Sequence, residues 1–308
     1  VSIATVSRVI HKSGRFSAET EKRVREVMEQ LNYVPDVVAQ GMRMRSMPIV
    51  GIIVPDIMDE NYALMVRTLQ KELFLNGYSA SIFNTNEDSA LASHFIGMLK
   101  TQRASGLVYV PDRNGDDVDP QGIPLVYFDR RPHGAAPENS VIVECDNFTG
   151  ARNAVAKLTA SGCQTIALLS EEKEISSHRE RIRGYHTALQ EAGLEAGPSY
   201  LVDSQRTTEA ISAMEGAFDN GVPFDAVFCT STRLTIGALT VLHQAGLSQD
   251  TVEVLGFGEH RLHRYGLLPY LAVREPIMDM AVTAANELMN LMNEKQPERQ
   301  IISMPVAD

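Results

Sequence analysis

Residues 49–56, Ile-Val-Gly-Ile-Ile-Val-Pro-Asp, decide the fold of most of the chain. A run of six apolar or small residues is typical of a strand buried on both faces of a parallel sheet, and Pro55-Asp56 ends the run. Similar segments then alternate with helical patterns along the rest of the chain. The alternation predicts an open α/β fold with parallel sheets and helices on both faces.

The expected elements follow one another at short intervals. We predict further strands over residues 79–84, 106–110, 124–128, 164–169, 225–229, 252–256 and 300–304. We predict helices over residues 61–76, 88–101, 147–161, 178–192, 206–220, 233–245 and 277–294. Because these units are too many for one sheet, we expect two similar doubly wound halves. Ligands of such folds lie beyond the carboxyl ends of the strands.

Composition indicates a globular chain of more than one domain. The 308 residues are too many for one ordinary core, and 44% hydrophobic with 22% charged residues are globular values. Cys145, Cys163 and Cys229 lie far apart, which argues against a disulfide framework or a zinc site. No apolar run approaches the roughly 18 residues of a membrane span, and no secretion leader opens the chain. We therefore expect a cytoplasmic protein that does not enter a membrane.

Charge is distributed unevenly along the chain. The formal net charge of −11 argues, by itself, against binding to nucleic acid. Residues 1–48, however, carry eight basic and five acidic side chains, a net of +3, and the remainder carries 20 basic and 34 acidic ones, a net of −14. A basic N-terminal segment on an acidic body is typical of a small DNA-binding domain joined to a larger domain with another function.

Residues 1–10 predict a short amphipathic helix that begins after Ser2, whose hydroxyl can cap it. An apolar stripe recurs at helical spacing, formed by Val6, Val9 and Ile10. The opposite face carries Thr5, Ser7 and Arg8. Hydroxyls can contact DNA phosphates, and a guanidinium can pair with a guanine edge. This division is typical of the recognition helix of a helix-turn-helix.

Two further segments follow before the first strand. Ser17 can cap a second helix, whose expected buried stripe is formed by Val24, Val27, Met28 and Leu31. Residues 36–45 predict a helix too short and too rich in β-branched residues to be stable alone in water. We interpret this segment either as one that folds on binding DNA, with Met42 as an apolar wedge for the minor groove, or as a simple linker.

A series of motifs stands in order along the chain. They are Val1-Ser2-x-Ala4-Thr5-Val6-Ser7-Arg8-Val9, Tyr33-x-Pro35, Ala39-x-x-Met42-Arg43, Ile49-x-Gly51-x-Ile53-x-Pro55-Asp56-Ile57, Phe128-Asp129-Arg130, Arg181-x-x-Gly184-Tyr185 and Gly237-Ala238. Over essentially its whole length the chain resembles the lactose-repressor (LacI-type) family of bacterial transcription regulators. The resemblance implies a homodimer that binds a palindromic double-stranded DNA operator.

The resemblance also implies a domain organisation. Residues 1–46 would form the helix-turn-helix headpiece with a hinge helix at 36–45, its first helix being expected upstream of residue 1. Residues 47–308 would form an effector-binding and dimerisation domain like a periplasmic sugar-binding protein. Its N-subdomain would comprise about 47–146 and 276–308, and its C-subdomain about 147–275.

By position in the family's motifs, Ile3, Ala4 and Arg8 would contact base edges, and Thr5 and Ser7 would contact phosphates. Met42 replaces the leucine that usually opens the central base step in the family, and its long, flexible apolar side chain suits the same role.

The effector site implied by the resemblance departs from the usual pattern. Tyr62, Asp129 and Arg181 match pocket positions of the family. Ser231 stands where the family has a polar pocket residue, and Gly258 replaces a usual aspartate and is followed by Glu259. This variant resembles the fructose-repressor and sucrose-repressor branch, in which effectors include phosphorylated sugars.

Two interpretations of the arginines remain open. Arg130 and Arg181 could hold a phosphate between them, since guanidinium groups suit bidentate contact. Arg130 could instead form a structural salt bridge.

Other signals favour a binding protein over an enzyme. The chain contains no Gly-x-x-x-x-Gly-Lys-Ser/Thr or Gly-x-Ser-x-Gly motif and no metal-binding histidine spacing, and we interpret His260 and His263 as members of an exposed loop. We therefore expect no catalytic residues, metal or cofactor. The predicted function is a repressor of carbohydrate-utilisation genes, controlled by a sugar or sugar phosphate bound between the subdomains. The alternatives are a sugar-binding protein of the transport class and, third, an enzyme on a doubly wound fold.

Overall fold

The computed structural model describes residues 1–10, 14, 16–31, 47–113, 119–171, 175–203, 206–218, 223–248 and 251–307. The chain divides into two units, Val1–Met47 and Pro48–Asp308, and each is described by itself. Residues 32–46 lie outside the described residues, so the expected hinge helix at 36–45 and the expected role of Met42 stay predictions.

The small unit contains the two expected helices, α1 (Ile3–Ile10) and α2 (Ala18–Gln30). Ser2 and Ser17 accept the backbone N–H groups of the residues three positions later, each at 3.2 Å, as N-caps do. Val9 and Val24 are buried. The predicted buried stripe of α2 is wrong at two positions, because Val27 and Leu31 are exposed. Within the described part of this unit, α1 packs against α2, and Val24 is the one residue of that stripe that is buried.

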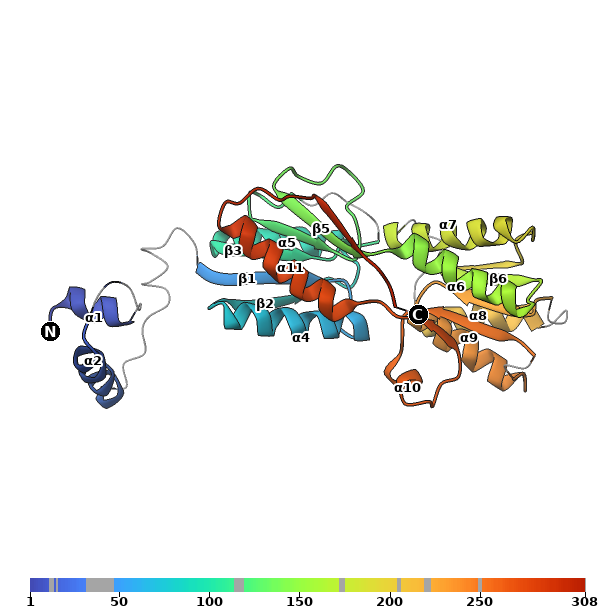
Figure 1. Cartoon of the computed structure of the whole chain (residues 1–308), viewed down its shortest axis with the longest axis horizontal. Helices are drawn as coiled ribbons and strands as arrows, with labels where there is room; N and C mark the ends of the chain where they lie inside the picture. The colour runs from blue at the N-terminus through green and yellow to red at the C-terminus, as the bar shows by residue number, and fades with distance from the viewer. Residues whose placement is uncertain are drawn as a thin grey trace. The chain divides into compact units, whose positions relative to one another are not determined.

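The large unit contains two parallel sheets (Figure 1). The first has the strand order β11-β5-β4-β3-β1-β2. Its strands are β1 (Met47–Val54), β2 (Ser79–Asn84), β3 (Ala104–Tyr109), β4 (Leu125–Phe128), β5 (Ser140–Cys145) and β11 (Ile301–Met304). With α4 (Glu60–Leu75), α5 (Ser89–Thr101) and α11 (Ile277–Met292), they form what we call the N-half.

The second sheet has the order β10-β9-β8-β6-β7. Its strands are β6 (Ile166–Glu171), β7 (Ser199–Val202), β8 (Ala226–Cys229), β9 (Glu253–Phe257) and β10 (Leu271–Val273). The helices of this C-half are α6 (Asn147–Ser161), α7 (Ser176–Glu191), α8 (Thr207–Phe218), α9 (Thr232–Gln244) and α10 (Arg261–Arg264). Helices α6 and α7 pack together on one face of the sheet, and α8 and α9 on the other (Figure 1).

The predicted fold class, two doubly wound parallel halves, is confirmed. Strands β5, β7 and β10 were not predicted, each for a physical reason. Ser140 and Glu144 interrupt the apolar pattern of β5 although all six of its residues are buried. Strand β7 is a largely uncovered edge strand, and β10 has only three residues. Periodicity is too weak a signal in such segments.

Strand β1 shows how each sheet is covered on both faces. Val50, Ile52 and Val54 pack in a cluster with α4 and α11, while Ile53 packs in a separate cluster with α5. This is the two-sided burial expected from a continuous apolar run. Gly51 permits the close approach of α5, since a Cβ atom at that position would lie 2.2 Å from Leu99 Cδ1.

Three chain segments join the two halves. The chain crosses between β5 and α6 at Asp146 and returns between β10 and α11 at residues 274–276. After β11 it comes back to the junction, where Ala307 pairs with Arg274 (Figure 1). These crossings place the carboxyl ends of the strands of both sheets around one space. The expected subdomain limits at about residues 146 and 276 stay a prediction.

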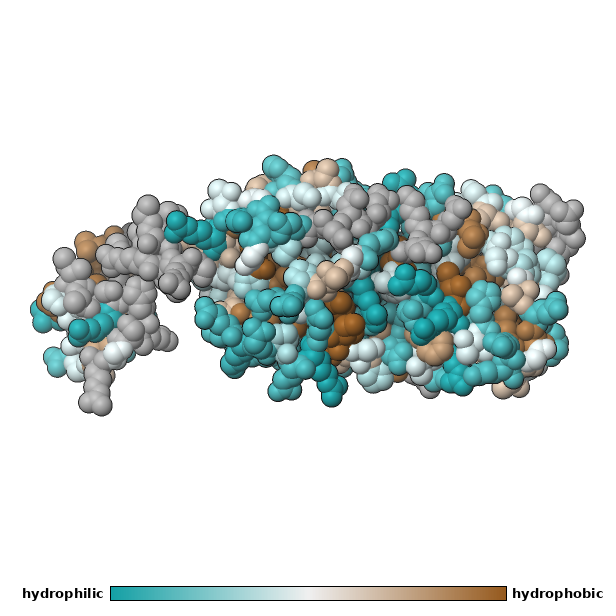
Figure 2. Space-filling model, turned by 90° about the horizontal axis from the view of Figure 1, so that it is seen from above, coloured by the Kyte–Doolittle hydropathy of each residue, from teal (hydrophilic) through white to brown (hydrophobic). Residues whose placement is uncertain are grey.

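The surface of the large unit is mixed. On the face drawn in Figure 2, hydrophilic side chains predominate and apolar ones form scattered patches. Exposed large apolar side chains of the N-half include Phe74, Leu75 and Met278. Within the described parts of the chain, no helix combines the length and apolarity needed to span a bilayer.

Candidate functional site

The expected DNA-contacting residues share helix α1 of the small unit. Arg8 is exposed, and Thr5 is half-buried with its hydroxyl 2.9 Å from that of Ser2. Ile3, Ala4 and Ser7 also belong to α1, but their side chains lie outside what the structure describes. The exposed Arg8 is free of the apolar face that buries Val9, as a base-reading side chain must be.

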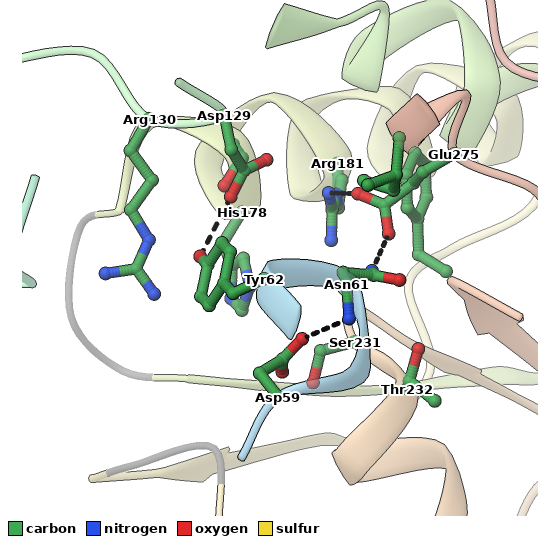
Figure 3. Close-up of a pocket in the computed structure, with 13 residues that line it drawn as sticks. Asp59, Asn61, Tyr62, Asp129, Arg130, His178, Arg181, Ser231, Thr232 and Glu275 are labelled. Atoms are coloured by element: carbon green, nitrogen blue, oxygen red, sulfur yellow. Dashed lines mark hydrogen bonds and ion pairs between the residues drawn. The ribbon is translucent and has the colours of Figure 1, made fainter. Parts of the chain in front are cut away.

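A pocket lies between the N-half and the C-half, at the carboxyl ends of the strands (Figure 3). We call it the inner pocket. It is lined by Asp59, Asn61, Tyr62, Asp129, Arg130, Ser177, His178, Arg181, Ser231, Thr232, Phe257, Glu275 and Ile277. The structure thus brings five of the six predicted effector residues together, and the exception is Glu259.

Asp129 directly follows β4 and holds a strained backbone conformation. Its φ of +64° lies in the left-handed region, which costs free energy for a residue with a side chain. Its Oδ2 accepts a hydrogen bond of 3.0 Å from the Tyr62 hydroxyl (Figure 3). Its Oδ1 is buried and has no hydrogen-bond partner among the described residues. A buried acceptor of this kind is poised to receive a hydroxyl or amine hydrogen from a ligand.

Arg181 projects from α7 and is only 4% exposed. Its three donor nitrogens each have a fixed acceptor: Nε donates to Asn147 Oδ1 at 2.7 Å, Nη1 to the Thr230 carbonyl at 2.8 Å and Nη2 to Glu275 Oε1 at 2.6 Å. Its guanidinium also stacks on the Phe257 ring, 3.8 Å from the ring centroid. The guanidinium is therefore held rigidly at the wall of the pocket before any ligand arrives.

Glu275 lies on the second crossing between the halves and contacts both of them. Its Oε1 accepts from Arg181 of the C-half, and its Oε2 accepts from Asn61 Nδ2 of the N-half at 2.7 Å (Figure 3). Burial raises the pKa of Glu275, and Arg181 opposes that rise. The carboxylate therefore links the two halves at the pocket itself.

Glu275 also supplies a carboxylate where the sequence suggested that one was lost. Gly258 stands at the position of the usual aspartate, and a Cβ atom built on it would lie 2.2 Å from Thr232 Oγ1 and 3.2 Å from Glu275 Oε2. The space of the missing side chain is thus occupied by Thr232 and Glu275. An acid is present at this wall, but it comes from a different segment of the chain.

His178 is a neutral member of the pocket. It is 3% exposed, and burial together with the neighbouring Arg181 and Arg130 lowers its pKa well below the ordinary value. Its Nδ1 lies 3.4 Å from the Thr230 hydroxyl. A neutral imidazole can exchange hydrogen bonds with a polar ligand without adding charge.

Arg130 is anchored by neighbours on its own half. Its Nη1 donates to both carboxylate oxygens of Glu87 at 3.1 Å and to the Pro111 carbonyl at 3.0 Å. Its guanidinium lies on the far side of Tyr62 from Arg181 (Figure 3). The structural salt bridge considered for Arg130 is therefore present, and the two arginines do not converge on one point as a phosphate clamp would require.

Glu259 does not line the inner pocket. Its two oxygens face Arg264 Nη2 at 2.8 Å and Arg274 Nε at 2.9 Å, and it borders a separate hollow with Glu60 and Arg67. Burial opposes ionisation, but the two arginines hold the pKa of Glu259 below its ordinary value. A left-handed Gly258, with φ of +103°, precedes Glu259 at the end of β9, and the chain there leads away from the pocket.

Eight of the pocket residues were not predicted as effector residues, and four of them form polar contacts: Asp59, Asn61, His178 and Glu275. The N-cap pattern Asp59-Glu-Asn after β1 could have indicated the first two, since Asp59 accepts the Asn61 N–H at 2.9 Å. His178 lies one helical turn before Arg181 and so shares its face of α7. Nothing in the sequence around Glu275 indicates its position.

No group of three or more His, Cys, Asp or Glu side chains that could hold a metal occurs in the part of the chain that the structure describes. Cys145, Cys163 and Cys229 are buried and reduced. Burial raises the pKa of Cys229 to about 12, so its thiol stays protonated and unreactive.

Comparison with known proteins decides the family. Residues 47–303 match the family described as periplasmic binding proteins and sugar binding domain of LacI family, and residues 1–36 match the bacterial regulatory proteins of the lacI family. The chain belongs to the LacI family. It is therefore a DNA-binding transcriptional regulator, and the alternative of a transport-class sugar-binding protein is not supported.

Similar proteins cover this LacI-family chain almost completely. Catabolite control protein A of Priestia megaterium is 26% identical over 315 residues, with 99% of this chain and 93% of that protein covered. The structure of the lac repressor dimer bound to operator and the anti-inducer ONPF matches with a TM-score of 0.86 at 22% identity, covering 100% of this chain and 93% of that one. The structure of the regulator CelR with cellobiose matches with a TM-score of 0.74 at 25% identity, covering 100% and 94%.

Proposed function

We propose that this LacI-family regulator represses carbohydrate-utilisation genes and that a small sugar or sugar phosphate, bound in the inner pocket, controls it. The observation that carries the proposal is the buried Oδ1 of Asp129, which lies in a pocket between the two halves and lacks a hydrogen-bond partner among the described residues. We further propose that it acts on DNA in the cytoplasm as a homodimer and catalyses no reaction.

The pocket has the chemistry that suits a sugar. Asp129 and Glu275 offer carboxylate acceptors, Arg181 offers a rigid planar donor, and Tyr62 and Phe257 offer aromatic walls. Adjacent sugar hydroxyls each donate one hydrogen bond and accept others, so they need such paired groups at fixed positions. The family description as a sugar-binding domain and the cellobiose bound to CelR support the same ligand class.

The pocket is placed to turn binding into a conformational signal. Asn61 of the N-half and Arg181 of the C-half meet at the Glu275 carboxylate, and Arg233 of the C-half pairs with Asp56 of the N-half at 2.7 Å. A ligand that contacts both walls stabilises this arrangement over one in which the halves are apart. Whether that shift strengthens or weakens DNA binding defines the effector as co-repressor or inducer.

The proposal is tested in two steps with a chain that includes the helix expected upstream of residue 1. Selection from a random double-stranded DNA library should enrich a palindrome, because a symmetric dimer reads two half-sites. Titration calorimetry against a panel of free and phosphorylated sugars should then identify a ligand that changes the affinity for that palindrome by roughly 5- to 150-fold. Failure to enrich a palindrome would contradict the DNA-binding dimer, and chemical conversion of a bound sugar would contradict the absence of catalysis.

A further inference from the structure

A second hollow opens beside the inner pocket, and we call it the outer chamber. Asp59, Tyr62 and Arg130 line both spaces, so the two are adjacent and share a wall. The outer chamber is distinguished by arginines from four separate segments, two from each half: Arg113, Arg130, Arg206 and Arg233. Four guanidinium groups therefore converge on one hollow, although the chain as a whole carries a net charge of −11.

The guanidinium groups of Arg113, Arg130 and Arg233 make the following contacts with neighbouring groups. Arg233 Nη1 lies 2.7 Å from Asp56 Oδ2, and Arg130 pairs with Glu87. Arg113 Nη1 donates to the Asp203 carbonyl at 2.8 Å and lies 3.3 Å from Glu171 Oε1. Because the partners fix these side chains, their remaining donors are arranged before a ligand binds, which reduces the entropy lost on binding.

One of those donors has no partner. Arg113 Nε is buried and makes no hydrogen bond to any described residue. The corresponding atom in the inner pocket is Asp129 Oδ1, which is an acceptor. A buried polar atom is unfavourable until it is paired, so the inner pocket favours a ligand donor and the outer chamber favours a ligand acceptor.

The charges of the two spaces also favour a ligand acceptor in the outer chamber, because its lining is more positive than that of the inner pocket. Charged side chains that line only the inner pocket are Asp129, Glu275 and Arg181, which sum to −1 with His178 neutral. Charged side chains that line only the outer chamber are Asp56, Glu87, Arg113, Arg206 and Arg233, which sum to +1. The lining of the outer chamber is therefore more positive than that of the inner pocket.

We propose that the outer chamber binds an anionic group, a phosphate or a carboxylate, of an effector whose hydroxyl-bearing ring occupies the inner pocket. The inference rests on the proposed function for the identity of the ring. It places the anion at Arg113, Arg206 and Arg233, with Arg130 at the boundary, instead of between Arg130 and Arg181. Guanidinium groups suit both anions, because each offers parallel N–H donors to two oxygens.

The test compares matched ligands on the full chain. Thermal-shift and calorimetric titrations would use glucose, glucose 6-phosphate, glucuronate and cellobiose, then fructose, fructose 1-phosphate and sucrose, and finally inorganic phosphate. We expect at least one phosphorylated or carboxylated sugar to bind about tenfold or more tightly than its neutral parent, the gain expected from charge-assisted hydrogen bonds. The phosphate and carboxylate members of the panel distinguish the two anions.

Substitutions in the outer chamber test whether the tighter binding of the anionic sugar arises there. Arg206→Gln and Arg233→Gln should each remove most of the preference for the anionic ligand, measured as the ratio of its affinity to that of the neutral parent in the same variant. The ratio is compared because Arg233 also pairs with Asp56 between the halves, and its loss affects both ligands. Arg152→Gln is the matched control, because it removes the same charge from a surface ion pair with Glu191 outside both spaces. Two variants keep the test decisive if one of them fails to fold.

Each outcome bears on one proposal or on both. Tighter binding of cellobiose or sucrose than of any anionic sugar would overturn the anion site and leave the sugar effector standing. Stabilisation by inorganic phosphate that is lost in both variants, without binding of any sugar, would support the anion site and contradict the sugar effector. An equal affinity for anionic and neutral sugars would overturn the anion site, and a chain that binds nothing in the panel would contradict both.

Discussion

In the large unit, apolar side chains from both sheets and their helices form three buried clusters, whereas the described part of the small unit buries the apolar side chains of Val9 and Val24. The large unit can therefore hold a ligand site in a fixed geometry with its own core. In its described part the small unit instead exposes Arg8 of helix α1, as a segment that reads a DNA groove requires. The comparison teaches that function is carried by buried, paired groups in one unit and by exposed groups in the other.

The largest effect is expected in the large unit, when a buried ion pair loses one of its two members. Arg181→Ala should lower the free energy of unfolding of the large unit by about 3–5 kcal/mol, because the buried Glu275 carboxylate loses its charged partner. It should also abolish the response to the effector. Chemical denaturation and ligand titration measure the two effects, and operator binding at 25 °C should persist.

A double variant separates stability from binding. Arg181→Ala combined with Glu275→Gln removes the uncompensated charge and should recover much of the lost stability without restoring effector binding. A double variant that binds the effector with wild-type affinity would remove Arg181 from the site. No recovery of stability would show that the ion pair is not the origin of the loss.

In the small unit, a substitution should change DNA binding and leave stability almost unchanged. Arg8→Ala removes an exposed side chain, so thermal stability should hardly change. The preference for the operator over other DNA should fall by about 1–3 kcal/mol, the discrimination expected of one bidentate base contact. Fluorescence anisotropy with operator and scrambled duplexes measures the preference. A uniform loss on both duplexes would assign Arg8 to phosphate contact instead of base reading.

The stability of the large unit should also depend on pH through His178. Burial, Arg181 and Arg130 lower its pKa well below 6.5, so the folded protein keeps it neutral while the unfolded chain takes up a proton below pH 6.5. The stability that the folded state gains from keeping His178 neutral is complete above pH 6.5 and is lost as the pH falls below it. Between pH 7.5 and 5.5 the wild type should lose about 1.4 kcal/mol more than His178→Gln, which cannot ionise. Parallel pH profiles of the two proteins would contradict this role.

The sequence predicted the elements better than the contacts among their side chains. Strand β1 and helix α6 follow from an apolar run and from the pair Asp146 and Gly162, which begin and end the helix. Tyr62, Asp129, Arg181 and Ser231 were placed through the resemblance to the LacI-type family, and the pocket brings all four together. Local patterns therefore suffice for the elements, whereas the site residues were found through the resemblance.

Glu275 and Glu259 show where such patterns fail. Glu259 follows the glycine of the family motif, yet it pairs with Arg264 and Arg274 outside the pocket. Glu275 follows a three-residue strand and enters the pocket because the chain crosses between the halves there. The position of a side chain at a crossing depends on how two separate cores are joined, and no periodicity within the segment encodes it.

The smallest effect tests whether a helix cap matters equally in both units. Ser17→Ala removes the cap of α2 in the small unit, and Asp88→Ala removes the cap of α5 in the large unit, each costing about 1 kcal/mol. With so little buried surface, the small unit should lose operator affinity up to about fivefold through Ser17→Ala, without a change in the melting temperature of the large unit. Asp88→Ala should lower that melting temperature by about 2–4 °C and leave operator affinity intact, because the large core absorbs the loss without changing its folded structure. Loss of operator affinity in Asp88→Ala without any effector present would show that the two units share their stability, and the contrast between a self-sufficient unit and an exposed one would have to be abandoned.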